Sequence, residues 1–166
     1  MMSSRLTYEQ LEPSHLDEFH SFMRDDQVRR YLLGGNIFPV EWSAERIQDS
    51  QALFKRRGVG FWLVRQQTSG ELLGFCGFME IPSVHPEPQI IYALFRRFSG
   101  KGHATEMARF CIAQARAQGF RDIVASVDAE NVASLRVLEK LGFGRISTLE
   151  GSVGKTFVLQ LTGDCG

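Results

Sequence analysis

Apolar and polar positions follow two different periods along the chain, and these periods predict a mixture of strands and helices. Apolar runs and alternations predict strands at 5–11, 60–65, 71–81, 90–95, 123–127, 143–149 and 154–161. Apolar positions three and four residues apart predict helices after Pro13, at 27–33, from a Ser43 cap to Arg57, after residue 103 and from 131 to 141. This order of elements favours an α/β fold with a mixed sheet.

The most informative stretch is the sequence RRFSGKGHATE at 96–106, which joins a predicted strand to a predicted helix. The apolar strand stops at Arg96, a loop with Gly100 and Gly102 follows, and helical spacing begins at Ala104. Unpaired amides and the dipole at a helix N-terminus favour an anion, and glycine lets the backbone approach a phosphate. Two interpretations stay open at this point: a phosphate site, or an ordinary tight turn between strand and helix.

Composition narrows the class of protein. The length of 166 residues suits a single domain, 1–166, and the zero net charge gives no field that would attract nucleic acid or an anionic membrane. The three cysteines, Cys76, Cys111 and Cys165, lack metal-ligand spacing, which predicts free thiols, no metal site and a cytoplasmic protein. No apolar run approaches the ~18–20 residues of a membrane span.

Several motifs together resemble a known family. Arg97-x-x-Gly100-x-Gly102-x-Ala104 resembles the pyrophosphate-binding signature of the GNAT superfamily of acetyl-CoA-dependent N-acyltransferases. Asn131-x-x-Ser134, followed by VLEKLGF at 137–143, is similar to the second conserved block of that superfamily. The segments at 26–32 and 74–78 are similar to those of the branch that acetylates ribosomal-protein N-termini. These blocks follow the order of the family over nearly the whole chain.

The resemblance implies a fold and a donor site. The expected fold is a mixed, mostly antiparallel sheet of six to seven strands, splayed at its centre and flanked by about four helices. Acetyl-CoA is the expected acyl donor, its pantetheine arm lying in the splay and a backbone N–H near Leu94 facing the thioester carbonyl. The residues assigned to the donor are Leu94, Phe95, Arg97, Phe98, Gly100, Lys101, Gly102, Ala104 and Asn131. Asn131 is expected to serve both as a helix N-cap and as a CoA contact.

The expected catalytic residues are Ser134 and Glu87. Ser134 lies one helical turn after Asn131, where its hydroxyl either protonates the departing thiolate or bonds to a carbonyl of the preceding turn. The tyrosine that many relatives place seven residues after the asparagine is absent, because that position is Leu138.

The general base is harder to place. Relatives often have a glutamate three residues before the tyrosine matched by Tyr92, but this chain has Gln89 there. Glu87 is hypothesised as the base because it would share the strand face of Gln89, provided that the strand extends past Pro88. Glu80, His85 and a bound water are the alternatives.

These observations predict an N-acetyltransferase. The acceptor is expected to be a primary amine, either a protein or peptide N-terminus or a small amine, which attacks acetyl-CoA directly in a ternary complex. The protein is expected to be a monomer or a homodimer. Acceptor selectivity is expected from the first helices and the loop at 34–42, where Tyr31, Ile37, Phe38 and Trp42 offer an apolar wall.

Two other classes of protein compete with this prediction. A non-catalytic acyl-CoA-binding regulator on the same fold stays open, because the glutamate expected at Gln89 and the tyrosine expected at Leu138 are missing. A dinucleotide-binding protein is excluded because the glycine loop does not follow the GxGxxG pattern.

Overall fold

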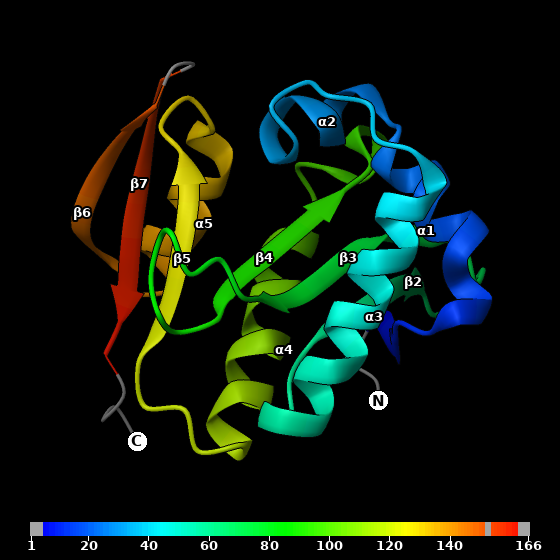
Figure 1. Ribbon diagram of the computed structural model, residues 1–166, viewed down its shortest axis with the longest axis horizontal. Helices are drawn as coiled ribbons and strands as arrows, with labels where there is room; N and C mark the ends of the chain where they lie inside the picture. Colours follow the sequence, from blue (N-terminus) through cyan, green and yellow to red (C-terminus); the bar gives the residue numbers. More distant parts are fainter. Residues whose placement is uncertain (1–4, 152–153, 163–166) are drawn as a thin grey trace.

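The computed structural model describes residues 5–151 and 154–162, and these residues form one sheet with helices on both faces (Figure 1). The strand order is β1-β2-β3-β4-β5-β7-β6. The strands are β1 (Leu6–Gln10), β2 (Phe61–Gln66), β3 (Leu72–Met79), β4 (Gln89–Leu94), β5 (Ile123–Asp128), β6 (Gly144–Gly151) and β7 (Gly154–Leu161). Among the strands of the described residues only β4 and β5 pair in parallel, so the sheet is mixed and mostly antiparallel, as the resemblance implied.

Five α-helices are present in the described part of the chain. They are α1 (Leu16–Met23), α2 (Asp26–Leu32), α3 (Val40–Arg57), α4 (His103–Ala117) and α5 (Val132–Lys140), together with the short 3-10 helices η1 (Pro13–His15) and η2 (Arg96–Phe98). This agrees with the expected fold, and α2 corresponds to the helical segment predicted at 27–33. Asp25 caps it, with its carboxylate accepting hydrogen bonds from the amides of Gln27 and Val28 at 3.0 and 3.2 Å.

The helices pack on the sheet through two apolar clusters. On one face α1 and α2 bury side chains such as Phe19, Phe22 and Val28 against Phe61 and Phe75. The other face carries α4 and α5, whose buried side chains include Met107, Cys111 and Leu138. The longer α3 contributes to both clusters, through Ile47 to the first and Leu53 to the second. Each face of the sheet therefore has its own core, and β4 and β5 lie between the two.

The prediction that Ser43 caps a helix is wrong. The helix α3 begins at Val40 and follows Pro39, whose ring fixes a backbone angle suited to the residue before a helix. Ser43 lies one turn inside and is fully buried, and its hydroxyl is hydrogen-bonded to Nδ1 of His20 on α1 at 2.8 Å. The serine therefore fastens α3 to α1 and does not begin the helix.

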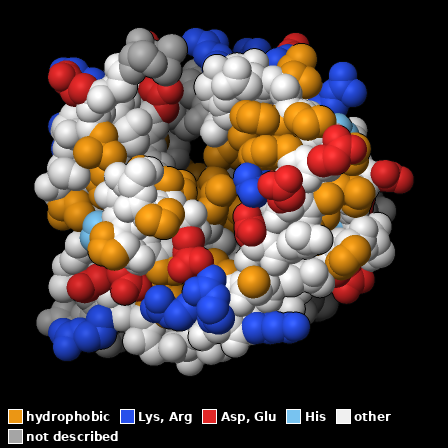
Figure 2. Space-filling view, in the orientation of Figure 1, with side chains coloured by type: hydrophobic (Ala, Val, Ile, Leu, Met, Phe, Trp, Pro, Cys, Tyr) orange, Lys and Arg blue, Asp and Glu red, His pale blue; other side chains and the backbone are white. Residues whose placement is uncertain are grey.

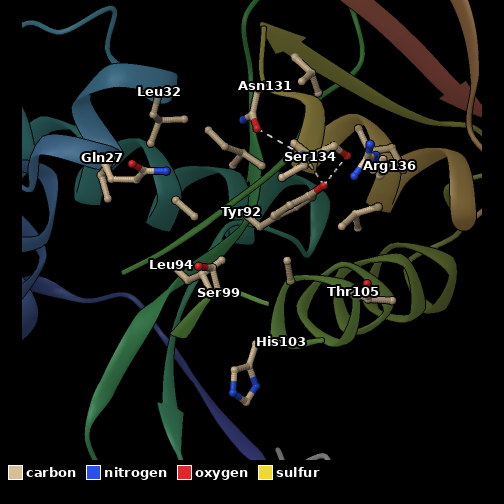
Figure 3. Close-up of a pocket in the computed structure, with 18 of the residues that line it drawn as sticks. Gln27, Leu32, Tyr92, Leu94, Ser99, His103, Thr105, Asn131, Ser134 and Arg136 are labelled. Atoms are coloured by element: carbon tan, nitrogen blue, oxygen red, sulfur yellow. Dashed lines mark hydrogen bonds between the residues drawn. The ribbon is translucent and has the colours of Figure 1, made fainter. Parts of the chain in front are cut away.

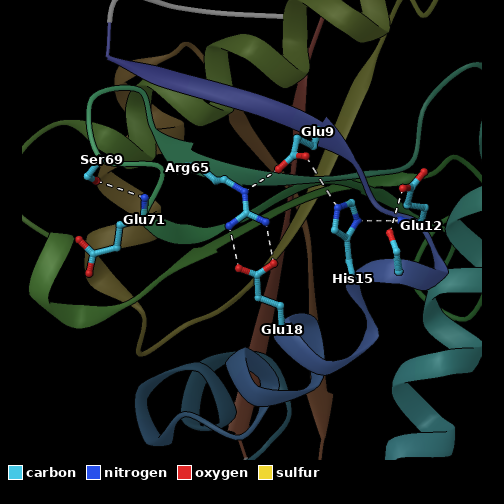
Figure 4. Close-up of polar contacts among 8 residues, drawn as sticks. Glu9, Glu12, His15, Glu18, Arg65, Ser69 and Glu71 are labelled. Atoms are coloured by element: carbon cyan, nitrogen blue, oxygen red, sulfur yellow. Dashed lines mark hydrogen bonds and ion pairs between the residues drawn. The ribbon is translucent and has the colours of Figure 1, made fainter.

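A charged cluster fixes α1 to the edge of the sheet (Figure 4). Arg65 on β2 donates two hydrogen bonds to the carboxylate of Glu18 on α1, at 2.6 and 2.7 Å, and a third to Glu9 on β1 at 2.5 Å. The paired guanidinium lowers the pKa of the Glu18 carboxyl and outweighs the opposing effect of its partial burial. This planar, two-point contact holds α1, and with it the start of α2, in a defined place.

Gly74 allows β3 and β4 to approach closely at the centre of the sheet. A Cβ atom at Gly74 would lie 2.0 Å from the carbonyl oxygen of Ala93 and 2.7 Å from Cα of Leu94. Both of these are backbone atoms, so the strands would have to separate to admit it. The glycine inside this strand is therefore explained by the packed backbone of its neighbour.

We predict that Gly74→Ala lowers the free energy of unfolding by about 1–3 kcal/mol, because the added methyl group meets backbone and not a movable side chain. Urea denaturation followed by circular dichroism measures the change as a lower midpoint. Gly144→Ala is the matched control, since a Cβ at this strand glycine has no neighbour within 4 Å. Equal midpoints for the two variants would contradict the prediction.

Candidate functional site

A cavity opens where β4 and β5 diverge. These strands pair at only two positions, Gln89 with Val124 and Ile90 with Ala125, and separate beyond them. The cavity has a volume of about 430 Å³ and is bounded by α2, the start of α4 and the start of α5. Figure 2 shows it as a hollow lined mainly by apolar side chains, between the part of the molecule that holds α2 and the part that holds β5 and α5. The predicted central splay of the sheet is thus confirmed.

One end of the cavity is formed by the glycine loop before α4. Gly100 and Gly102 both have positive φ, 78° and 83°, and Gly102 occupies the cap position of α4. The first bond of the helix runs from the amide of Glu106 to the carbonyl of Gly102 at 3.1 Å, so the amides of residues 103–105 have no partner within the helix. Since Gly100, Gly102 and Ala104 line the cavity, this end suits an anion.

The edge of β4 offers further amides to the cavity. The amide of Phe95 donates to the carbonyl of Leu73 on β3 at 3.0 Å, in register with the pairing of Leu94 and Gly74. Because amide direction alternates along a strand, the N–H groups of Tyr92 and Leu94 point the other way, toward β5. The β5 ladder ends at Ile90, so these two amides face the cavity.

The structure brings together most of the predicted donor residues. Leu94, Phe98, Gly100, Gly102, Ala104 and Asn131 all line the cavity, and so does Arg96. The side chains of Phe95, Arg97 and Lys101 do not. Arg97 is instead paired with Glu71 at 2.8 Å, and its guanidinium lies over the rings of Phe95 and Phe98 at 4.8 and 4.7 Å. This stacking supports the loop from outside the cavity.

A polar group that the sequence did not reveal lies at the middle of the cavity wall (Figure 3). The hydroxyl of Tyr92 on β4 is 2.9 Å from Oγ of Ser134 on α5, and 3.3 Å from the Ser134 carbonyl. The amide of Ser134 donates to Oδ1 of Asn131 at 3.2 Å, which makes Asn131 the N-cap of α5 as predicted. Burial raises the pKa of Tyr92 to about 12, although the hydrogen bond with Ser134 opposes the shift. Tyr92 is therefore protonated and neutral at neutral pH.

The structure does not place Glu87 at the cavity. Its strand begins only at Gln89, and the Glu87 carboxylate is paired with Arg57 at 3.2 Å. Gln89 is 1% exposed. Its side-chain amide donates to the carbonyls of Glu87 and His85 at 2.6 and 3.2 Å, and these two bonds shape the loop that carries Glu87 and His85. The other candidates also lie elsewhere, with Glu80 paired to Arg56 at 2.6 Å.

Asp128, at the end of β5, is the one carboxylate among the described residues that line the cavity. One of its oxygens accepts a hydrogen bond from the amide of Glu130 at 2.9 Å and forms the turn into α5. Ile90 pairs with Ala125, so three residues further along each strand Asp128 lies opposite Ala93 across the widening gap. The only sequence signal at this position is an acid shortly before the Asn131 helix cap.

The α2 side of the cavity is formed by Gln27, Val28 and Leu32. The apolar wall expected from the loop at 34–42 lies outside this lining: Ile37 is 62% exposed, and Phe38 stacks on Trp42 at 4.6 Å. The side chain of Tyr31 is outside what the structure describes.

Within residues 5–151 and 154–162, no group of three or more His, Cys, Asp or Glu side chains is placed to hold a metal ion, and no helix is both long and apolar enough to cross a membrane.

Comparison with known proteins agrees with this geometry. The profile of the acetyltransferase (GNAT) domain matches residues 5–144, which is most of the chain. The chain belongs to the GNAT acetyltransferase family. This family uses acetyl-CoA as its acyl donor, and the fold predicted from the resemblance is the one observed.

Individual relatives resemble this GNAT domain over most of their length. An uncharacterised protein of Bacillus subtilis, YkkB, is 33% identical over 135 residues, which cover 79% of this chain and 76% of that protein. A GNAT-family acetyltransferase structure from Bordetella pertussis has a TM-score of 0.84 at 23% identity, covering 96% of this chain and 97% of that one. RimL, a ribosomal L7/L12 α-N-protein acetyltransferase solved with coenzyme A, has a TM-score of 0.83 at 18% identity, covering 100% and 98%. At these identities the two structures share the fold.

The raised pKa of Tyr92 predicts a loss of stability in alkali. Between about pH 10, where an exposed tyrosine ionises, and about pH 12, the unfolded chain releases a proton that the folded chain keeps. Stability contributed by this group is therefore complete below pH 10 and falls as the pH rises to 12. Urea midpoints measured across this interval should fall more steeply for the wild type than for Tyr92→Phe. Parallel curves for the two proteins would show that Tyr92 ionises normally.

Proposed function

We propose that this protein transfers the acetyl group of acetyl-CoA to a primary amine by direct attack in a ternary complex. The observation that carries the proposal is the gap between β4 and β5. It has helix amides without partners in the helix at one end, strand amides facing it along one side and a carboxylate on the other. An extended donor can lie along the strand edge in this gap while an amine approaches from the α2 side.

The donor is held mainly by backbone. We assign the CoA pyrophosphate to the amides at the start of α4 around Gly100, Gly102 and Ala104, where the helix dipole favours negative charge. The pantetheine arm extends along β4, and the amide of Leu94 donates to the thioester oxygen as it gains charge. Asn131 uses Oδ1 for the amide of Ser134, which leaves Nδ2 as its donor toward the arm.

Ser134 and Tyr92 are assigned to the departing thiolate. When the amine nitrogen has bonded to the acetyl carbon and the C–S bond breaks, the sulfur takes a proton from the Ser134 hydroxyl. Ser134 regains a proton from the attacking nitrogen, which carries one more than the amide product keeps. Tyr92, whose hydroxyl lies 2.9 Å from the serine oxygen, keeps its own proton and donates a hydrogen bond to that oxygen. The high pKa of Tyr92 suits this role, because the phenol stays protonated over the whole neutral range.

Asp128 is assigned to the incoming amine. An ammonium group cannot attack until it loses a proton, and a carboxylate that lines the cavity can attract the cation and accept that proton. We assign to Asp128 the role of general base that was expected of Glu87, because the Glu87 carboxylate is paired with Arg57. The acceptor itself is assigned as the α-amine of a peptide or a small primary amine; likeness to the branch that acetylates ribosomal proteins supports the peptide first.

The function is tested by measuring free CoA released from acetyl-CoA in the presence of a panel of N-terminal peptides and small primary amines. We expect release that depends on the amine, and we expect Gly102→Glu to abolish CoA binding, because glutamate disfavours the positive φ of this residue and displaces the loop amides. Gly70→Glu is the matched control, since this turn glycine also has positive φ but lies away from the cavity. Tight CoA binding without turnover over the whole panel would identify a regulator instead.

The role of Asp128 is tested with Asp128→Asn, which keeps the oxygen that accepts the amide of Glu130 but removes the charge. We expect kcat/KM to fall by ~10² or more for alkylamines, which are cations at neutral pH. Activity with a weakly basic amine such as hydroxylamine, which is already neutral, should change little. Equal losses with both kinds of amine would show that the side chain serves only the turn.

A further inference from the structure

Arg5, which immediately precedes β1, reaches across the molecule to the glycine loop. Its Nη1 donates to the carbonyl oxygen of Lys101 at 3.0 Å, and its Nε and Nη2 contact Oε1 of Glu106 at 3.1 and 2.9 Å. These contacts join residues separated by 96 and 101 positions in the sequence. Arg5 itself does not line the cavity. The guanidinium therefore connects the first strand to the loop and to the first turn of α4 from behind.

The bond to Lys101 fixes the direction of one peptide plane. In a trans peptide the C=O and the following N–H point in opposite directions, and no cis peptide bond is present in the described chain. Because the Lys101 carbonyl points out of the cavity to Arg5, the N–H of Gly102 points the opposite way. Gly102 lines the cavity, so its amide is presented there as a donor.

Arg5 also contacts the loop at Gly102 and balances a nearby negative charge. A Cβ at Gly102 would lie 3.6 Å from Nη2 of Arg5, so the guanidinium packs directly behind this residue. Glu106 places a carboxylate in the first turn of the same helix, close to where an anion would bind. An exposed ion pair contributes little by itself, and the Arg5 side chain is 46% exposed. The hydrogen bond to the Lys101 carbonyl is therefore the more important contact.

We propose that Arg5 is a positioning residue for the acyl donor: it turns the Lys101–Gly102 peptide so that the Gly102 amide faces the phosphates, without touching CoA itself. The inference rests on the proposed pyrophosphate site and is independent of the acceptor. A flexible loop would have to order this peptide when the donor binds, whereas Arg5 orders it beforehand.

The experiment measures the dissociation constants of CoA and 3′-dephospho-CoA by titration calorimetry. Arg5→Met should raise both constants by about tenfold, because the loop amide is no longer held in place. Glu106→Gln, which keeps the bond to Lys101, should change them by less than about twofold. The double variant Arg5→Met/Glu106→Gln should bind as weakly as Arg5→Met alone.

Each competing explanation has its own outcome. A loss confined to CoA and absent with 3′-dephospho-CoA would mean that Arg5 binds the 3′-phosphate directly. Recovery of affinity in the double variant would mean that Arg5 only neutralises Glu106. Unchanged affinity in Arg5→Met would also overturn the proposal. Failure of the wild type to bind CoA would instead refute the proposed donor site.

A second variant guards against a general loss of structure. Arg5→Lys keeps the positive charge but lacks the planar fork that reaches Lys101 and Glu106 together. We expect it to weaken both ligands by a factor between those of the wild type and Arg5→Met, at an unchanged melting temperature of the free protein. Affinity equal to that of the wild type would show that charge alone is sufficient and would overturn the positioning role.

Discussion

The short pairing between β4 and β5 is the constraint on which the rest of the structure depends. Two residue pairs join these strands, and everything that forms the cavity follows from their separation beyond Ile90. Each strand is held firmly on its other side, β4 by six pairs with β3 and β5 by six pairs with β7. Neither strand can therefore slide to close the gap. The N-terminal ends of α4 and α5 stay at its two margins.

In the proposed site, backbone groups mainly bind the donor and side chains mainly transfer protons. The loop at 99–102, the start of α4 and the edge of β4 offer amides, whose positions depend on glycines and strand register. In the proposed reaction the acting side chains are the Tyr92–Ser134 pair, Asp128 and, as a donor to the arm, Asn131. This division explains how an acceptor site can change while the donor site stays the same, because the acceptor side is formed by α2 and not by the loop.

A structural feature could be predicted from the sequence when the residues that form it lie close together in the chain. The glycine loop, the Asn131 cap and the positions of the strands along the chain depend on neighbours within a few residues. The structure agrees with these predictions. The contact of Tyr92 with Ser134 spans 42 residues, so no local pattern could reveal it. Glu87 was misplaced because Pro88 delays the strand to Gln89 and because Arg57 competes for the carboxylate. The start of α3 was missed because Ser43 is a common cap residue that here is buried against His20.

The divided sheet also has a mechanical consequence. Within the sheet, the half formed by β1 to β4 and the half formed by β5 to β7 are linked edge to edge over a length of two residues. A donor arm that carries amides and bonds to the β4 edge bridges the two halves and stiffens their joint. Occupancy of the site is then coupled to the rigidity of the whole protein, since a ligand that binds only the folded chain stabilises it. In the proposed binding mode the cosubstrate is a temporary eighth strand.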